Sequence, residues 1–244
     1  MTIQIDKTTY RAKAANERVR FLVLHYTAAP LKGSIEALTG PNVSAHYLVP
    51  DSRPDGIFQL VDETRRAWHA GVSHWQGRDN LNDTSIGIEI VNLGFTREPG
   101  EESVWYPFPD AQIDAVMTLA GDIVRRYGID PTCVIGHSDI APGRKSDPGP
   151  LFPWERLARQ GVGAWPDAAE VRARRERANP NDVKGLQEKL RRYGYKIAVT
   201  GRLDQHSHDV VKAFQMHFRP AQCNGLPDAE TVAILETLLD KYRR

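Results

Sequence analysis

Short apolar runs alternate with a helical segment over the first two thirds of the chain. The runs lie at residues 19–26, 84–92 and 132–137. Each is rich in aliphatic and β-branched residues and too short for a buried helix, which is typical of buried strands. Residues 110–128 place apolar side chains at helical spacing and close on a glycine. Further elements are expected at 34–40 (helix), 44–50 and 55–61 (strands). The pattern predicts an α/β domain with a mixed central β-sheet flanked by helices.

A change in composition separates a second region from this domain. The segment 178–183 contains Asn, Pro and Asp, which favour a break and a new helix start. Amphipathic helical stripes follow at 182–195, 202–218 and 226–242. We therefore expect two domains, residues 1–178 and a small three-helix domain of residues 179–244.

Composition excludes several classes of protein. The net charge is +1, with 41% hydrophobic and 26% charged residues, so nothing favours nucleic acid or an anionic membrane as partner. No apolar run approaches the roughly 20 residues that span a bilayer, and the N-terminal stretch has no apolar core of signal-peptide length. Cys133, in the apolar run CVIGH, is expected to be a buried thiol.

Two histidines stand at the ends of predicted strands. His25 closes the run VRFLVLHY and His137 closes TCVIGH. Asp147 lies ten residues after His137, beyond the turn-forming PGRKSDPG, which is expected to fold it back. Two imidazoles, a carboxylate and an open position for water form the ligand set of a hydrolytic zinc site. Asp139, the other nearby aspartate, is expected to cap the loop instead.

Two further residues complete a hydrolytic site. Glu89 lies inside the apolar strand IGIEIVN, where a raised pKa would suit a general base. The alternative is that Glu89 points to a solvated face of the sheet. Lys145 precedes Asp147 by two residues and is placed to stabilise an oxyanion, unless it is an ordinary solvated loop lysine.

Five ordered motifs make the sequence recognisable. They are FLVLHYTA, SAHYLVP, AWHAGVS, LNDTSIGIEIVN and GHSDIAPGRKSDPGPLFPW. Together, over residues 15–170, they resemble the zinc-dependent N-acetylmuramoyl-L-alanine amidases of the amidase-2 type, most closely the AmiD/AmpDh3-like branch. The resemblance implies a phage lysozyme-like amidase fold and one Zn²⁺ bound by His25, His137 and Asp147. It also implies that Glu89 activates water and that Lys145 stabilises the tetrahedral intermediate.

The same motifs suggest residues that contact substrate. His46 either touches substrate or supports the metal site by hydrogen bonding. Trp68 and His69 are expected to line the groove, with a core position as the alternative for Trp68. Arg144 is a candidate clamp for a substrate carboxylate, with a surface role as the alternative.

The resemblance implies hydrolysis of the amide between the lactyl group of N-acetylmuramic acid and L-alanine, in peptidoglycan or muropeptides. Two alternatives are a non-catalytic peptidoglycan recognition protein and a zinc peptidase that cuts within the stem peptide. In the C-terminal region, VKGLQEKLRRYGY and VVKAFQMHF resemble peptidoglycan-binding domains. The usual glycine-rich turn between them is replaced by TGRLDQHSHD, so a domain that only buttresses the catalytic one is the alternative.

Location follows from the substrate. We expect the periplasm or cell envelope, with the cytoplasm or export by a dedicated secretion system as alternatives. Delivery into rival cells would imply an immunity protein as partner.

Overall fold

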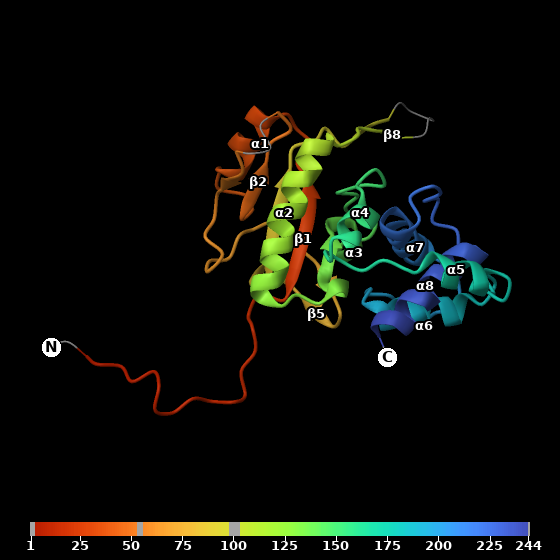
Figure 1. The fold of residues 1–244 in the computed structure, drawn as a ribbon. Helices are drawn as coiled ribbons and strands as arrows, with labels where there is room; N and C mark the ends of the chain where they lie inside the picture. Colours follow the sequence, from red (N-terminus) through yellow and green to blue (C-terminus); the bar gives the residue numbers. More distant parts are fainter. Residues whose placement is uncertain (1–2, 53–55, 98–102, 244) are drawn as a thin grey trace.

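A five-stranded mixed sheet forms the centre of the larger half of the molecule (Figure 1). The computed structural model describes residues 3–52, 56–97 and 103–243. The strands, in sheet order, are β3 (Phe58–Gln59), β2 (Tyr47–Val49), β6 (Ser85–Ile90), β1 (Phe21–Tyr26) and β9 (Val134–Gly136). All neighbours pair in parallel except β3, which is antiparallel to β2. The predicted α/β class with a mixed sheet is confirmed. The strand expected from residue 55 starts outside the described residues.

Helix α2 (Asp110–Tyr127) crosses one face of the sheet (Figure 1). Its buried stripe is the one expected from sequence and comprises Ile113, Val116, Ala120 and Ile123. Gln112, fully buried, donates from Nε2 to the carbonyls of Val49 and Val91 and so ties the helix to strands β2 and β6. Gly128 ends the helix in the left-handed region at φ 60°. Helix α1 (Leu31–Leu38) lies in the connection from β1 to β2.

Several short elements escaped the sequence prediction. Two small hairpins are formed by β4 (His74–Trp75) with β5 (Arg78–Asp79), and by β7 (Phe95–Thr96) with β8 (Val104–Trp105). The single-turn helices are η1 (Leu81–Asp83), η2 (Pro131–Cys133) and α3 (His137–Ile140). Elements of two to four residues carry no periodicity that a sequence pattern can reveal.

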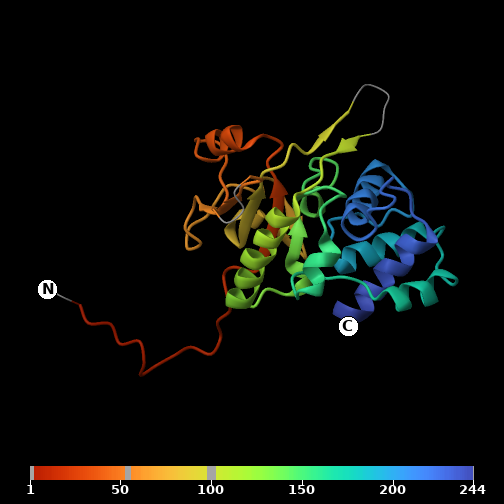
Figure 2. The same cartoon turned by 45° about the horizontal axis from the view of Figure 1, so that its top comes forward.

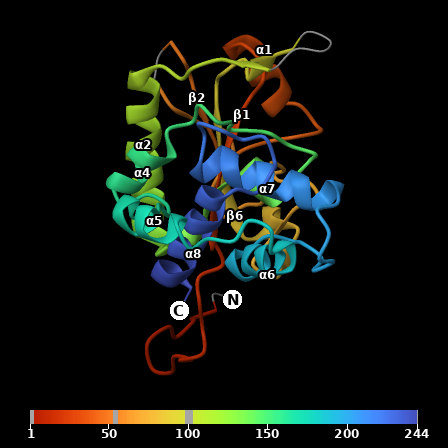
Figure 3. The ribbon, with the colours of Figure 1, turned by 90° about the vertical axis from the view of Figure 1, so that its right-hand side faces the viewer.

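The smaller half is helical, as expected. It contains α6 (Val183–Tyr193), α7 (Gln205–Phe218) and α8 (Ala229–Tyr242). Each helix starts at an aspartate whose side chain accepts a hydrogen bond from a backbone N–H of the first turn. Helix α4 (Trp154–Arg159) leads from the sheet to α5 (Ala168–Arg175). Figures 1, 2 and 3 show α5 to α8 gathered beside the sheet, and α5 packs on α8.

The two halves share one apolar core. Trp75 of β4 meets Tyr193 and Tyr195 edge to face, with ring centroids 6.0 and 4.8 Å apart. Trp154 of α4 stacks on His217 of α7 at 3.8 Å. Helix α5 precedes the predicted boundary at residues 178/179 and packs on α8, which follows it. Cys133 is buried, and burial raises its pKa to about 11. Among the described residues, no helix combines the length and apolar character needed to cross a membrane.

Candidate metal centre and catalytic cavity

Two histidines and a glutamate lie in a row across the edge of the sheet where the parallel strands end. His25 on β1 pairs in register with Glu89 on β6. On the other side Leu24 pairs with Gly136, which places His137 beside His25, one residue past the end of β9. Side chains paired in register point to the same face of a sheet, so these strands bring Glu89, His25 and His137 together.

The loop after β9 carries Asp147 back to the two histidines. Its backbone turns through hydrogen bonds from Arg144 N and Lys145 N to the carbonyl of Ala141, at 3.1 and 3.0 Å. Ser138 N then donates to the carbonyl of Asp147 at 2.9 Å and closes the loop. The sequence therefore folds back at this loop as its turn residues suggested.

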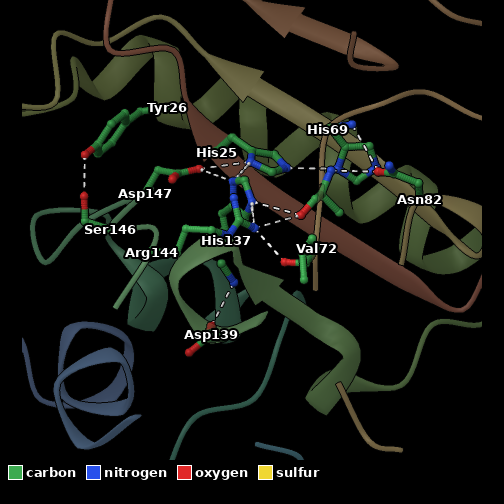
Figure 4. Close-up of polar contacts among 12 residues, drawn as sticks. His25, Tyr26, His69, Val72, Asn82, His137, Asp139, Arg144, Ser146 and Asp147 are labelled. Carbon is green, nitrogen blue, oxygen red and sulfur yellow. Dashed lines mark hydrogen bonds and ion pairs between the residues drawn. The ribbon is translucent and has the colours of Figure 1, made fainter. Parts of the chain in front are cut away.

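The donor atoms of His25, His137 and Asp147 form a small triangle (Figure 4). His25 Nδ1 lies 3.0 Å from both His137 Nδ1 and Asp147 Oδ2, and His137 Nδ1 lies 3.1 Å from Asp147 Oδ2. All three residues are buried, at 1, 4 and 6% exposure. Ligands held about 2.1 Å from one tetrahedral zinc lie roughly 3.4 Å apart, so the triangle has the size of a metal site.

The proton positions on His25 follow from a hydrogen-bond relay. Ser85 Oγ donates to the carbonyl of Leu81 at 2.7 Å and so accepts from His69 Nε2 at 3.0 Å. The other nitrogen of His69, Nδ1, is then an acceptor and receives the Nε2–H of His25 at 3.0 Å. Nδ1 of neutral His25 therefore carries a lone pair toward the triangle.

His137 also presents the lone pair of its Nδ1 to the triangle, but a different hydrogen bond holds its proton on Nε2. Its Nε2 lies 3.2 Å from the carbonyl of Ala70, which only accepts, so the proton of the neutral ring is on Nε2. Its Nδ1 lone pair also faces the carboxylate of Asp147. Three lone-pair atoms at this spacing repel one another unless a cation lies between them. Two oriented imidazoles and a carboxylate therefore fit a zinc ion.

Burial supports the neutral form of His25 and of His69, its partner in the relay. Burial, opposed by Asp147 and reinforced by the neighbouring His137, lowers the pKa of His25 to about 4. Burial also lowers the pKa of His69 well below its usual value, with His25 as the next cause. Two neutral imidazoles and an ionised carboxylate are the forms that bind a metal.

His69 was expected at the substrate, and its contact with His25 was not foreseen. It is 7% exposed, and its ring packs directly against β6 at Gly87. A Cβ at Gly87 would overlap that ring, so only glycine allows the approach. The signal in the sequence was this glycine in the strand SIGIEI, two residues before Glu89.

Glu89 has an unsatisfied buried oxygen. Its Oε2 has no hydrogen-bond partner among the described residues. Burial, together with the negative charge of Asp147, raises the pKa of Glu89 well above its usual value, and Lys145 opposes this. The carboxylate lines a cavity rather than an open face of the sheet. A desolvated carboxylate beside a metal site has the properties of a general base.

The catalytic cavity has a volume of about 330 Å³. Glu89, His137 and Asp147 line it together with three of the expected substrate residues and Lys145. The three are Trp68, His69 and Arg144. Trp68 is 52% exposed, so it is not a core residue. Arg144 is exposed and anchored by a hydrogen bond from Nη2 to the carbonyl of Val72 at 2.7 Å.

His46 lies behind the cavity. It is fully buried and its Nδ1 accepts from Gly87 N at 3.0 Å, while Nε2 donates to the carbonyl of Arg65 at 3.2 Å. Both nitrogens are occupied by backbone groups, and His46 is not among the residues that line the cavity. The geometry favours hydrogen-bonding support over substrate contact, and this support goes to the backbone at Gly87 and Arg65 rather than to a predicted metal ligand.

Comparison with protein families agrees with the geometry. Residues 15–150 match the family model described as N-acetylmuramoyl-L-alanine amidase, which is more than half of the chain. Residues 179–235 match the model of a putative peptidoglycan binding domain.

Individual relatives cover nearly the whole chain. The N-acetylmuramoyl-L-alanine amidase AmiD of Escherichia coli K12 is 50% identical over 98% of this chain and 88% of its own length. A solved complex of the E. coli AmiD with the substrate anhydro-N-acetylmuramic acid-L-Ala-D-gamma-Glu-L-Lys superposes with a TM-score of 0.90, at 49% identity, over 96% of this chain and 94% of that one. The crystal structure of AmpDh3 from Pseudomonas aeruginosa gives 0.91, at 45% identity, over 100% of both chains.

Proposed function

The chain belongs to the N-acetylmuramoyl-L-alanine amidase family, and we propose that it hydrolyses the amide between the lactyl group of N-acetylmuramic acid and L-alanine with one zinc ion held by His25, His137 and Asp147. The substrate is a muropeptide, either polymeric or released with an anhydro sugar. The anhydromuropeptide bound to the E. coli relative supports the released form as one substrate.

A single observation carries the proposal. The unpartnered oxygen of Glu89 stands in register with His25, beside a triangle of three lone-pair atoms. A structural carboxylate at this depth would have hydrogen-bond donors. A base kept free of donors next to a ligand set is what metal-assisted hydrolysis needs.

The mechanism assigns a role to each residue. Zinc, when bound, supplies a Lewis acid that makes water more acidic and polarises the scissile carbonyl. Glu89 takes a proton from the attacking water, and its raised pKa lets it pass that proton to the leaving amine of L-alanine. Lys145 donates to the carbonyl oxygen as negative charge develops there. His69 holds the tautomer of His25 through the relay to Ser85.

Substrate contacts are proposed from the lining of the cavity. The exposed indole of Trp68 supports packing against a sugar or peptide at the mouth. Arg144 is held in place by backbone carbonyls and supports a contact with a stem-peptide carboxylate. His69 contributes the edge of its ring, and His46 supports the wall through Gly87.

The helical half is proposed to hold the enzyme on peptidoglycan, and the division into residues 1–178 and 179–244 stays a prediction. The family match over residues 179–235 supports wall binding. A substrate in the cell wall supports a place in the periplasm or cell envelope. Cell fractionation tests the compartment, and an immunity protein is expected only if the protein is found delivered to other cells.

Mass spectrometry of a muropeptide digest tests the reaction. The proposal predicts free stem peptides that begin with L-alanine, released by zinc-loaded enzyme and not by the Glu89→Gln variant. Fragments cut after D-residues would identify a peptidase instead. Binding of muropeptide without any release of amine would identify a recognition protein.

A further inference from the structure

The catalytic cavity continues into a groove between the two halves of the molecule. A second cavity of about 320 Å³ shares Arg144, Lys145 and Ser146 with the catalytic one. A third, of about 450 Å³, continues from it past Lys212 to the loop 220–224. We call these two the interdomain groove. Since the catalytic cavity measures about 330 Å³, most of the connected space lies outside it.

The walls of the interdomain groove come from both halves. The hairpin of β7 and β8 contributes Phe95 and Trp105, and helix α7 contributes Lys212 and Met216. Figure 2 shows this hairpin projecting from the sheet on the side where α7 lies. The groove therefore exists only because the helical half is docked where it is.

An aromatic surface lines the hairpin side. Phe95 and Trp105 pack at 4.7 Å between ring centroids, and Phe95 is 38% exposed. The indole of Trp105 rests on Gly149, where a Cβ would lie 2.8 Å from the ring and φ is +82°. Trp105 is thus fixed against the loop that carries Asp147. A fixed, half-exposed indole offers an apolar face to the CH groups of a sugar ring.

Among the described residues, the lining of the groove carries more positive than negative charge. Its second cavity is lined by four cations, Arg97, Arg144, Lys145 and Lys212, against the single carboxylate of Asp209. Within the described residues, Gln205 Nε2 donates to Asp209 at 2.9 Å, so this carboxylate already has a partner. The whole chain carries only +1, so this is a local concentration of positive charge.

We propose that the interdomain groove binds the neighbouring disaccharide-peptide repeat of a polymeric peptidoglycan strand while one repeat is cut in the catalytic cavity. The inference rests on the proposed function and adds a substrate preference to it. Sugar rings match the aromatic hairpin, and the carboxylates of stem peptides match Arg97 and Lys212. Continuity with the catalytic cavity sets the occupant, because a linked repeat must leave that cavity through its open side.

A charge-reversal pair tests the groove. Arg97→Glu with Lys212→Glu should lower kcat/KM on purified sacculi by about tenfold, because attraction is replaced by repulsion along the strand. The rate on a soluble single repeat, an anhydromuramic tripeptide, should change by less than about twofold. The matched control is Arg11→Glu with Lys13→Glu, which makes the same change in net charge on exposed residues that precede β1 and lie outside both the groove and the helical half.

The outcomes separate the groove from the reaction. Three outcomes would overturn the proposed role of the groove. The groove pair and the control pair could slow sacculi hydrolysis equally, or the groove pair could slow hydrolysis of both substrates equally. The third outcome is that the groove pair does not slow hydrolysis at all. Trp105→Leu should repeat the selective loss on sacculi, and its unchanged rate on the single repeat shows that it folds. If the wild type releases stem peptide from neither sacculi nor the single repeat, the proposed function fails instead.

Discussion

Two aspartates on one loop show how differently a buried carboxylate is stabilised in this molecule. Asp147 and Asp139 lie eight residues apart, are 6 and 1% exposed, and each contacts histidine. Asp139 accepts from Gly136 N at 2.8 Å, from the Tyr195 hydroxyl at 2.5 Å and from His217 Nδ1 at 2.7 Å. Asp147 Oδ2 instead faces nitrogen lone pairs whose protons are committed elsewhere.

The hydrogen-bond donors around each carboxylate distinguish the structural aspartate, Asp139, from the candidate metal ligand, Asp147. Asp139 accepts hydrogen bonds from protein donors only. Because its partners Tyr195 and His217 lie in the helical half, Asp139 also joins the loop that carries Asp147 to that half. Asp147 Oδ2 lacks such donors among the described residues, which is the arrangement that the proposed metal ion would satisfy. The contact made by the second imidazole nitrogen therefore distinguishes the two aspartates: where that nitrogen donates to an acceptor, the nitrogen that faces the carboxylate keeps a lone pair for a metal.

The largest effect is expected when Asp147 loses its charge. Asp147→Asn should reduce zinc from about one ion per chain to a trace and lower amidase activity by more than about 10⁴-fold, because the Lewis acid and the base act together. Elemental analysis and muropeptide turnover measure both. The variant should unfold at the same temperature as the zinc-free wild type. A full complement of zinc in this variant would remove Asp147 from the site.

Glu89 extends the comparison to a carboxylate with an unpartnered oxygen. Glu89→Gln should lower kcat by about 10² to 10⁴-fold while zinc stays bound, because proton transfer is lost and the ligands are intact. The check is turnover measured on protein of known zinc content. Loss of zinc along with activity would make Glu89 a ligand or a support, and the assignment as base would fall.

Much of the fold and of the candidate site could be predicted from the sequence, and the features that could not be predicted were missed for physical reasons. Strand and helix periodicity identified β1, β6, β9 and α2, and the strand ends identified His25 and His137 as candidate ligands. Local patterns cannot reveal register, so the pairing of His25 with Glu89 became visible only in the sheet. The relay from His25 through His69 to Ser85 spans 60 residues and has no local signature.

The interface between the halves was the least predictable feature. Asp139 was expected to cap its loop, and it does accept from Gly136 N. Its partners Tyr195 and His217 lie 56 and 78 residues away, on elements that sequence periodicity describes only as amphipathic. Docking of one domain on another depends on shape and cannot be obtained from the period of a helix.

The relay can be tested against a neighbouring histidine. His69→Ala should weaken zinc binding by about 10 to 100-fold, because the tautomer of His25 is no longer held. Competition with a chelator measures the affinity. His46→Ala is the matched control, since His46 contacts β6 without touching a ligand, and it should leave zinc affinity unchanged. Equal losses in the two variants would mean that His69 only fills space.

A smaller effect is expected at Asp139. Tyr195→Phe removes one donor from the carboxylate and should lower the free energy of unfolding by about 2 kcal/mol, with zinc content unchanged. Tyr193→Phe is the control, because the Tyr193 hydroxyl has no hydrogen-bond partner within the described part of the chain, and it should stay within about 0.5 kcal/mol. Urea denaturation of both variants decides. A zinc loss in Tyr195→Phe would show that the interface supports the ligands.

The smallest effect concerns Glu63, a carboxylate paired with a cation. Arg126, opposed by partial burial, lowers the pKa of Glu63 to about 2, below about 4.3 in an unfolded chain. A carboxyl group whose pKa is lower in the folded than in the unfolded chain stabilises the folded state at pH values above its unfolded pKa. This stabilisation is lost as the pH falls from about 4.3 to about 2. The free energy of unfolding of the wild type should exceed that of Arg126→Gln by about 1 kcal/mol or less at pH 6. This difference should narrow as the pH falls from about 4.3 to about 2. A gap independent of pH would mean that Arg126 acts through packing alone.

Anomalous diffraction at the zinc absorption edge tests the central claim most directly. The account predicts one strong peak about 2.1 Å from His25 Nδ1, His137 Nδ1 and Asp147 Oδ2, in crystals of the zinc-loaded protein. A peak at other residues, or none within bonding distance of these three atoms, would contradict it.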